Sequence, residues 1–221
     1  WGFHLTNIIL YIIVVLLVYL LALKFFKKEW LAFISGLIFA IHPIHSETVS
    51  WISGRGDLLV GILFLAALLF YIQFREKNLK KFYWLSLGFF FVGLFAKETM
   101  LAFIPTIIFY DLINKHISKS YFNDLLYFIA ATAVFIAARI SVLGALFLSV
   151  DKYIVNNPLH SAPLLVLLPN LARLVFVYLQ YFIFPINITY LLSFEVLHPF
   201  SLLNIISIIS LVLIFILCIY L

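Results

Sequence analysis

Long apolar runs separated by short polar stretches make up nearly the whole chain. A helix needs about 20 residues to cross the roughly 30 Å hydrocarbon core of a bilayer. The runs that approach this length are residues 5–24, 30–45, 57–74, 82–97, 98–113, 122–141, 164–184 and 201–221. An open sheet would leave its backbone unsatisfied in lipid, and no alternating barrel pattern is present. The pattern therefore predicts an all-α, polytopic transmembrane bundle of about eight helices.

The composition agrees with this prediction and excludes a soluble domain. The 221 residues are 66% hydrophobic and 10% charged, with 25 Phe and 12 Tyr. In a typical soluble domain, about a quarter of the residues are charged. The single cysteine, Cys218, excludes a disulfide framework or a thiolate metal site. No internal repeat or Gly/Ser linker divides the chain, so we predict one domain over residues 1–221.

The distribution of lysine and arginine indicates the topology. Most of them fall in three polar stretches, residues 24–29, 75–81 and 114–121. Positive loops face the cytoplasm, so these three stretches are predicted to lie inside. Alternation then places residues 42–57, 96–99 and 141–163 on the external face. The net charge of +5 therefore reports topology and does not indicate a nucleic-acid partner.

The most unusual polar segment is residues 42–57, HPIHSETVSWISGRGD. Ionisable residues at or near membrane depth are costly and are usually kept for function. A solubilising loop would be rich in lysine and glutamate, whereas this one combines histidines, an arginine, an aspartate and a tryptophan. The segment therefore predicts a functional site on the external face.

The same segment carries a family resemblance. The motif FAIHPIHSETV at residues 39–49, followed by GRGDLL at residues 54–59, resembles the HPxHxExV…GRxDLL signature of the transmembrane and tetratricopeptide-repeat-containing O-mannosyltransferases. Weaker matches follow in order: FHLTN at residues 3–7, AKE at 96–98, Arg139, Asn157-Pro158, and Arg173 with Tyr178 and Pro185. With their bacterial and archaeal relatives, these proteins belong to the GT-C superfamily of membrane glycosyltransferases.

The resemblance implies a GT-C-like bundle and a reaction. Such enzymes transfer a sugar, here mannose-like, from a polyprenyl- or dolichyl-phosphate carrier to a protein or lipid acceptor on the external face. The expected partners are therefore the lipid-linked donor, the acceptor and membrane lipid. Family members begin with a helix and an external loop that carries the acidic catalytic residue, and usually end in tetratricopeptide repeats. The chain is then expected to start at the second helix, with the catalytic residue upstream of Trp1, and to lie in a plasma membrane or the endoplasmic reticulum.

Within this resemblance, Arg55 is expected to bind the carrier phosphate, because a guanidinium grips a phosphodiester bidentately. Asp57 either orients Arg55, binds a sugar hydroxyl or caps a helix. Gly54 and Gly56 lack side chains, which would let the backbone approach the ligand.

His42, His45 and Glu47 leave several interpretations open. They can hydrogen-bond sugar hydroxyls or orient a catalytic acid, and neutral imidazoles with a carboxylate can also ligate a divalent metal. A plain structural cap is the third alternative. Pro43 bends the chain between the histidines, so the three would not share one helical face. This favours hydrogen bonding over a metal, and no other cofactor is expected.

Further candidates for the phosphate lie along the chain. Lys97 would add a second cation aligned by Glu98, although an interfacial ion pair is the alternative. Arg139 ends its helix externally and can serve the same phosphate. Arg173 lies well inside an apolar run, so it is expected to face the bundle or a cavity. Asn157 would help to roof the site.

A lipid or solute transporter is the alternative function. Transporters place ionisable residues near the midplane in broken helices, often in two related halves. Here the polar residues gather at one face and no halves repeat, which favours the enzyme. The enzyme hypothesis also predicts that Arg55, Lys97 and Arg173 converge on one cavity.

Overall fold

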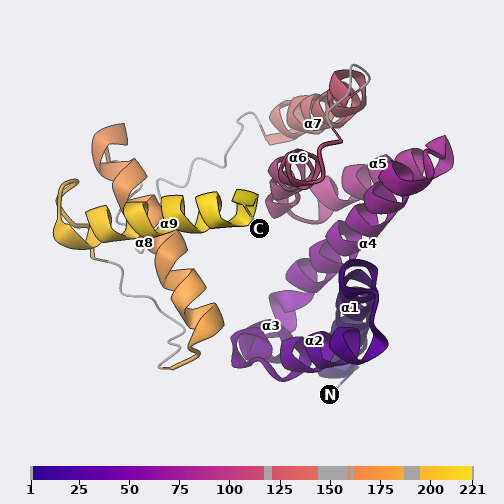
Figure 1. Ribbon diagram of the computed structural model, residues 1–221, viewed down its shortest axis with the longest axis horizontal. Coiled ribbons are helices and arrows are strands. Elements are labelled where there is room, and N and C mark those ends of the chain that lie inside the picture. Colours follow the sequence, from indigo (N-terminus) through magenta and orange to yellow (C-terminus); the bar gives the residue numbers. More distant parts are fainter. Residues whose placement is uncertain (1, 117–120, 144–158, 160–161, 187–194, 221) are drawn as a thin grey trace. The chain divides into compact units, whose positions relative to one another are not determined.

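The computed structural model describes residues 2–116, 121–143, 159, 162–186 and 195–220, and these ranges contain helices but no strand (Figure 1). The α-helices are α1 (Gly2–Phe26), α2 (Glu29–Ile41), α3 (Ser46–Ser50), α4 (Arg55–Lys77), α5 (Lys80–Ala96), α6 (Phe103–Ile113), α7 (Tyr121–Leu143), α8 (Leu164–Ile183) and α9 (Leu202–Tyr220). The 3-10 turns are η1 (Pro43–His45), η2 (Ile52–Gly54) and η3 (Glu98–Ala102). Apart from the short α3, each α-helix corresponds to one predicted run, so the all-α class is confirmed.

Two predicted runs are shorter as helices than the sequence suggested, and proline explains both. The run 30–45 stops at Ile41, because the residue before Pro43 is extended, with φ −68° and ψ 123° at His42. The run 98–113 opens with the 3-10 turn η3, and α6 starts only at Phe103. Pro105 lies in the first turn of α6, where its missing N–H costs no hydrogen bond.

The helices are apolar on their outer faces as well as in the core, as expected for a membrane protein. Four of the described helices are long and apolar enough to cross a bilayer: Gly2–Phe26, Ile52–Lys77, Phe122–Val142 and Leu164–Ile183. Glu29–Ile41 and Leu202–Cys218 are shorter apolar helices. Large side chains such as Phe33, Val142 and Leu202 are more than half exposed. The chain is a multi-pass membrane protein.

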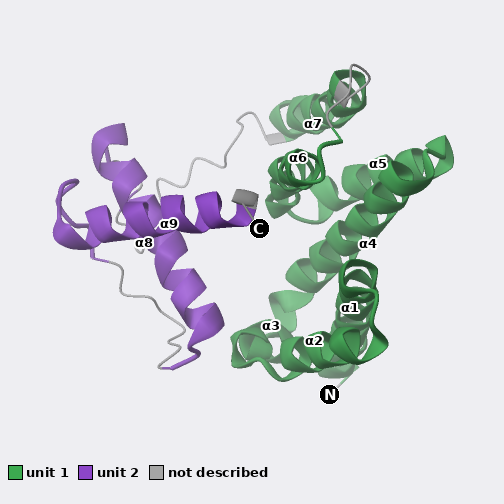
Figure 2. Cartoon of the chain, viewed as in Figure 1, with its two compact units in different colours: residues 1–146 green, residues 147–221 purple. Residues whose placement is uncertain are grey.

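The chain divides into two compact units, Trp1–Leu146 and Phe147–Leu221 (Figure 2). Unit 1 holds α1 to α7, and unit 2 holds α8 and α9. The sequence-based expectation of a single domain over residues 1–221 stays a prediction.

The core of unit 1 is aromatic and lies between α4, α5, α6 and α7. Tyr71, Phe90, Phe103 and Phe128 come from these four helices and are at most 1% exposed. Their ring centroids lie 5.3–6.4 Å apart, within the range of favourable aromatic pairs. The contacts among these four rings hold the four helices together.

A polar contact joins α4 and α5 inside this apolar environment. The buried hydroxyl of Ser86 donates to the carbonyl oxygen of Ala67 at 2.8 Å, and neither residue is exposed. Small residues let membrane helices approach closely, and a serine hydroxyl can then bond across the interface. The two helices therefore pack as a close antiparallel pair.

A buried ion-pair network holds α4, α6 and α7 together at the predicted cytoplasmic end. Arg75 pairs with Asp111 at 2.9 Å and with Asp124 at 3.0 Å, and the Tyr71 hydroxyl donates to Asp111. The side chains of Arg75 and Asp111 are 8% and 0% exposed. The sequence analysis predicted only a topological role for Arg75 and did not foresee these ion pairs. The missed signal was Asp111, an acid inside an apolar run.

Candidate functional site

The segment 42–57 is not an open loop, as the sequence suggested, but a folded series of short turns. It forms η1, α3 and η2, and Arg55 is already the first residue of α4. His42 begins the series by accepting a hydrogen bond at Nδ1 from the backbone N–H of Ile44, 3.2 Å away. The site side chains are therefore held on short, defined elements.

The start of α1 anchors this segment. The buried amide of Asn7 donates through Nδ2 to the carbonyl oxygens of Val49 at 3.1 Å and Trp51 at 2.8 Å. The hydroxyl of Tyr11 lies 2.9 Å and 3.0 Å from the carbonyl oxygens of Phe39 and Ala40. The side chains of Asn7 and Tyr11 therefore tie the start of α1 to carbonyls of this segment and of the end of α2.

Charged residues from three helices meet next to this segment. Lys97 forms an ion pair with Asp57, and Arg139 lies 3.6 Å from Glu98. The pairs link the first turn of α4, the junction of α5 with η3, and the last part of α7. We call these four residues, together with Arg55, which precedes Asp57 by two positions in the first turn of α4, the charged junction.

The partners in the charged junction differ from those the sequence suggested. Glu98 pairs with Arg139 and Asp57 pairs with Lys97, whereas Glu98 was expected to align Lys97 and Asp57 was weighed as an orienter of Arg55. The side chains of Lys97, Asp57 and Glu98 are 38%, 48% and 58% exposed. Exposed pairs contribute only about 0–1 kcal/mol to stability. The junction is therefore held loosely enough for a ligand to replace a partner.

Arg55 is the cation of the junction that forms no ion pair with a carboxylate among the described residues. Its guanidinium carbon lies 5.0 Å from the centroid of the Phe3 ring, and Nε donates to the carbonyl oxygen of Ile52 at 3.3 Å. These contacts orient the guanidinium without neutralising it. With three cations and two carboxylates, the junction carries a surplus positive charge that suits an anionic ligand.

The histidines line a separate small cavity of about 260 Å³. Its walls are Tyr11, Ala40, Ile41, His42, Pro43, His45, Ser46, Val49 and Ser50. The rings of His42 and His45 lie 6.0 Å apart, and His45 packs at 4.2 Å from Phe39. Nε2 of His45 is buried and has no hydrogen-bond partner in the part of the chain that the structure describes. Burial, with a smaller contribution from His42, holds the pKa of His45 below its ordinary value, so the ring is neutral at pH 7.

The metal interpretation gains no support from this geometry. Among the described residues, no three His, Cys, Asp or Glu side chains lie together as a metal-ligating group. His42 and His45 face a common cavity, but Glu47 does not line it. The fold thus separates the carboxylate from the imidazoles, because Glu47 lies in α3 beyond the turn that carries the histidines.

Two predicted site residues do not belong to the described residues of unit 1. Asn157 lies outside the described residues. Arg173 belongs to α8 in unit 2, where its guanidinium donates to the carbonyl oxygen of Glu195. On the same helix the buried Asn170 bonds both backbone groups of Leu197, at 2.9 Å and 3.0 Å. The convergence of Arg173 with Arg55 and Lys97 therefore stays a prediction.

The sequence suggested that Gly54 lets the backbone approach a ligand, whereas the structure gives it a packing role. A Cβ atom at Gly54 would lie 2.2 Å from the carbonyl oxygen of Thr48, whereas at Gly56 it would meet nothing within 4 Å. The missing side chain of Gly54 therefore lets η2 pack on α3. Gly56 remains open on its outer side.

Gly54→Ala is expected to destabilise the protein by about 1–3 kcal/mol, because a clash with backbone cannot be relieved by a rotamer change. Gly56→Ala should stay within about 1 kcal/mol of the wild type, since alanine favours the helix. Thermal unfolding of the two purified variants in the same detergent compares them directly. Equal unfolding temperatures would contradict the packing of Gly54 on Thr48.

The charged junction, the histidine cavity and their motifs all lie within the part of the chain that matches a known family model. Residues 1–143 match the model described as dolichyl-phosphate-mannose-protein mannosyltransferase. The chain belongs to this family. The suspected resemblance is thereby confirmed for the part of the chain that contains unit 1.

Curated relatives agree with the family. The chain is 50% identical over 70 residues to the protein O-mannosyl-transferase TMTC1 of Homo sapiens, covering 31% of this chain and 8% of the relative. It is 32% identical over 121 residues to Tmtc2 of Drosophila melanogaster, covering 52% and 13%. It is 33% identical over 133 residues to F38B6.6 of Caenorhabditis elegans, covering 59% and 19%.

The matched segments thus span less than a fifth of the length of each of these relatives. No solved structure shows a significant match to the chain.

Proposed function

We propose that the full-length protein transfers a mannose-like sugar from a polyprenyl- or dolichyl-phosphate carrier to a protein or lipid acceptor. The observation that supports this proposal is the charged junction. It brings together two ion pairs at the ends of three helices, and it includes Arg55, which pairs with no carboxylate among the described residues. A cation at the end of a membrane helix is suited to a phosphate that is attached to a lipid and therefore stays at the membrane surface.

Arg55 would bind the phosphodiester of the carrier through its guanidinium fork. As the bond between sugar and phosphate breaks, negative charge grows on the leaving phosphate. A cation fixed beforehand beside that charge stabilises the transition state more than the ground state. Lys97 would join Arg55 by exchanging Asp57 for the phosphate, because its ion pair is exposed.

The imidazoles of His42 and His45 would hydrogen-bond sugar or acceptor hydroxyls in the histidine cavity. The unpartnered Nε2 of His45 is the atom available for this. The reaction also needs a base for the acceptor hydroxyl. We assign that role to the acidic residue that members of the family carry in their first external loop.

The direct test is sugar transfer by the full-length protein in lipid vesicles that contain radiolabelled polyprenyl-phosphate mannose. We expect label in the acceptor fraction, and none when a nucleotide-linked mannose replaces the lipid-linked donor. Transfer from the nucleotide sugar alone would contradict the proposal. Movement of the intact donor across the vesicle membrane, without transfer, would support the transporter alternative.

The same vesicles test the side of the reaction. A cysteine introduced at Ser50 should react with a membrane-impermeant thiol reagent from the side on which the donor is consumed. A cysteine introduced at Lys80 should be protected from that side. The reverse pattern would show that the Lys/Arg rule assigns the topology wrongly. The external face would be the outer surface of a plasma membrane or the lumen of the endoplasmic reticulum.

A further inference from the structure

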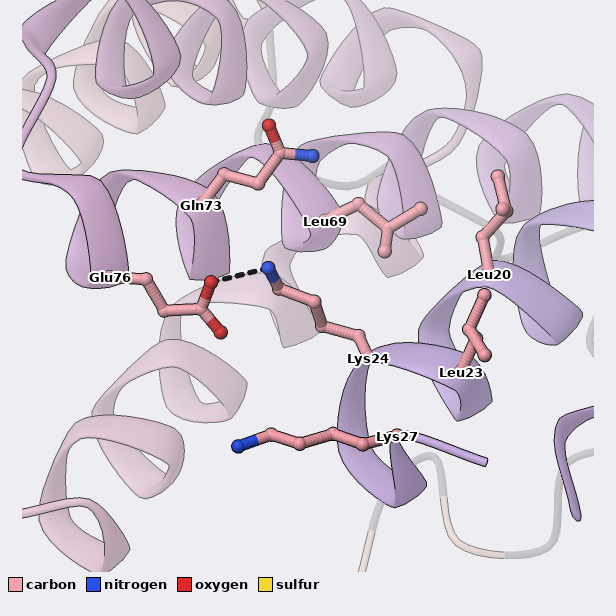
Figure 3. A pocket seen from close by; sticks show the side chains of 7 residues that line it. All are labelled: Leu20, Leu23, Lys24, Lys27, Leu69, Gln73 and Glu76. Carbon is pink, nitrogen blue, oxygen red and sulfur yellow. Dashed lines mark hydrogen bonds and ion pairs between the residues drawn. The ribbon is translucent and has the colours of Figure 1, made fainter. Parts of the chain in front are cut away.

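A cavity in unit 1 lies at the opposite end of α4 from the charged junction. It has a volume of about 500 Å³ and opens between the last turns of α1 and α4 (Figure 3). α4 begins with Arg55 in the junction and ends at Lys77, beside this cavity. The proposed donor site does not use any of its lining residues.

The cavity is apolar on one part of its wall and polar on the other. Its apolar wall consists of Leu20, Leu23 and Leu69, and its polar wall of Lys24, Lys27, Gln73 and Glu76. On both helices the polar residues lie nearer the helix end than the leucines. The spacing of three or four residues puts each set on one helix face. The polarity of the cavity therefore changes along the membrane normal, as it does in a phospholipid.

One ion pair crosses the cavity and leaves a surplus of positive charge. Lys24 pairs with Glu76, as Figure 3 shows. Lys27 extends along the mouth of the cavity, and no ion pair or side-chain hydrogen bond is made by it or by Gln73 among the described residues. The cavity thus presents an ammonium and an amide to a ligand, with a net charge of one positive unit.

The backbone at Lys27 decides which substitution can remove its side chain without disturbing the fold. Lys27 has φ 53°, and its N–H donates to the carbonyl oxygen of Leu23 at 2.9 Å, which closes α1. A left-handed residue at this position is usually glycine, since other residues are strained there by about 1 kcal/mol. Asn78 and Lys115 adopt the same conformation, with φ 52° and 55°, so it marks the end of a helix and does not by itself indicate a function. Lys27 keeps an ammonium at a place where glycine would fit more easily.

We propose that this cavity binds an anionic phospholipid from the leaflet on the basic face. Lys27 contacts the phosphodiester, Gln73 donates to a headgroup or glycerol oxygen, and the acyl chains lie on the leucines. A soluble phosphate would find the ammonium but not use the apolar wall. The lipid would bridge α1 and α4 at the end opposite to the site of sugar transfer, and its binding does not depend on the proposed reaction.

The test measures lipid retention by the full-length protein purified in detergent with labelled phosphatidylglycerol or phosphatidylcholine. The wild type should retain phosphatidylglycerol in preference. Lys27→Gly should lower its retention about five- to tenfold, because one lysine near a membrane surface contributes about a factor of this size. Glycine relieves the left-handed backbone, so this variant should unfold at the same temperature as the wild type or a higher one.

Lys28→Ala is the matched control. Lys28 is the next residue along the chain, and its substitution removes the same charge, but its side chain does not line the cavity. It should change retention less than twofold. Equal loss in both variants, or equal retention of the two lipids, would overturn the proposal in favour of a general surface charge. Displacement of the lipid by millimolar inorganic phosphate would show that the ligand is a soluble anion, and preferential retention of polyprenyl phosphate would assign the cavity to the carrier.

Discussion

Asp111→Ala is expected to lower the free energy of unfolding by about 3–5 kcal/mol, because it leaves the guanidinium of Arg75 buried with half of its compensation removed. Asp111 is fully buried and accepts hydrogen bonds from Arg75 and from the Tyr71 hydroxyl. Asp124, the other carboxylate that pairs with Arg75, is 19% exposed and bonds Nη1, whereas Asp111 bonds Nε and Nη2. The measurement is chemical or thermal unfolding of the purified variant.

Two variants separate the lost charge from the lost packing. Asp57→Ala removes the carboxylate of an exposed ion pair and should cost no more than about 1 kcal/mol. The double variant Arg75→Met/Asp111→Met removes both charges and should recover much of the loss, since buried pairs replaced by apolar residues are often neutral for stability. If the double variant were as unstable as Asp111→Ala, the penalty would come from packing and not from the uncompensated charge.

Arg55→Ala is expected to reduce sugar transfer by roughly thirty- to a thousand-fold. Removing a charge-assisted contact to developing charge costs about 2–4 kcal/mol of transition-state stabilisation, and about 1.4 kcal/mol corresponds to a factor of ten in rate. Arg55→Lys should recover only part of the rate, because an ammonium keeps the charge but lacks the bidentate fork. The assay is transfer from radiolabelled polyprenyl-phosphate mannose in reconstituted vesicles.

The control for Arg55 is Lys81→Ala, which removes a cation near the basic ends of the helices. Lys81 is exposed and lies 5.0 Å from the ring of Phe82, as Arg55 does from Phe3. It should leave the transfer rate unchanged. Unfolding temperatures of both variants should remain close to that of the wild type, since Arg55 contributes only a partly exposed ring contact and one hydrogen bond. Wild-type transfer by Arg55→Ala would reduce Arg55 to a topological charge.

Most helices and their order could be predicted from apolar run length alone, because a bilayer requires long, uniformly apolar helices. The prolines at residues 43 and 105 decided where two of these helices end or begin. The sequence did not reveal that residues 42–57 form turns and not a loop. That outcome depends on Asn7, which bonds carbonyls in the segment from α1, on Tyr11, which bonds carbonyls at the end of α2 just before it, and on the contact between Gly54 and Thr48.

The sequence by itself determined the membrane class, the candidate residues and, through its motif, the family. Tertiary structure alone decided which charges meet. Asp57 reaches Lys97 and Glu98 reaches Arg139 because the ends of α4, α5 and α7 come together. Arg75 is buried because α6 brings Asp111 against it. Ion pairs across 36 to 49 residues depend on helix packing, which local periodicity does not encode.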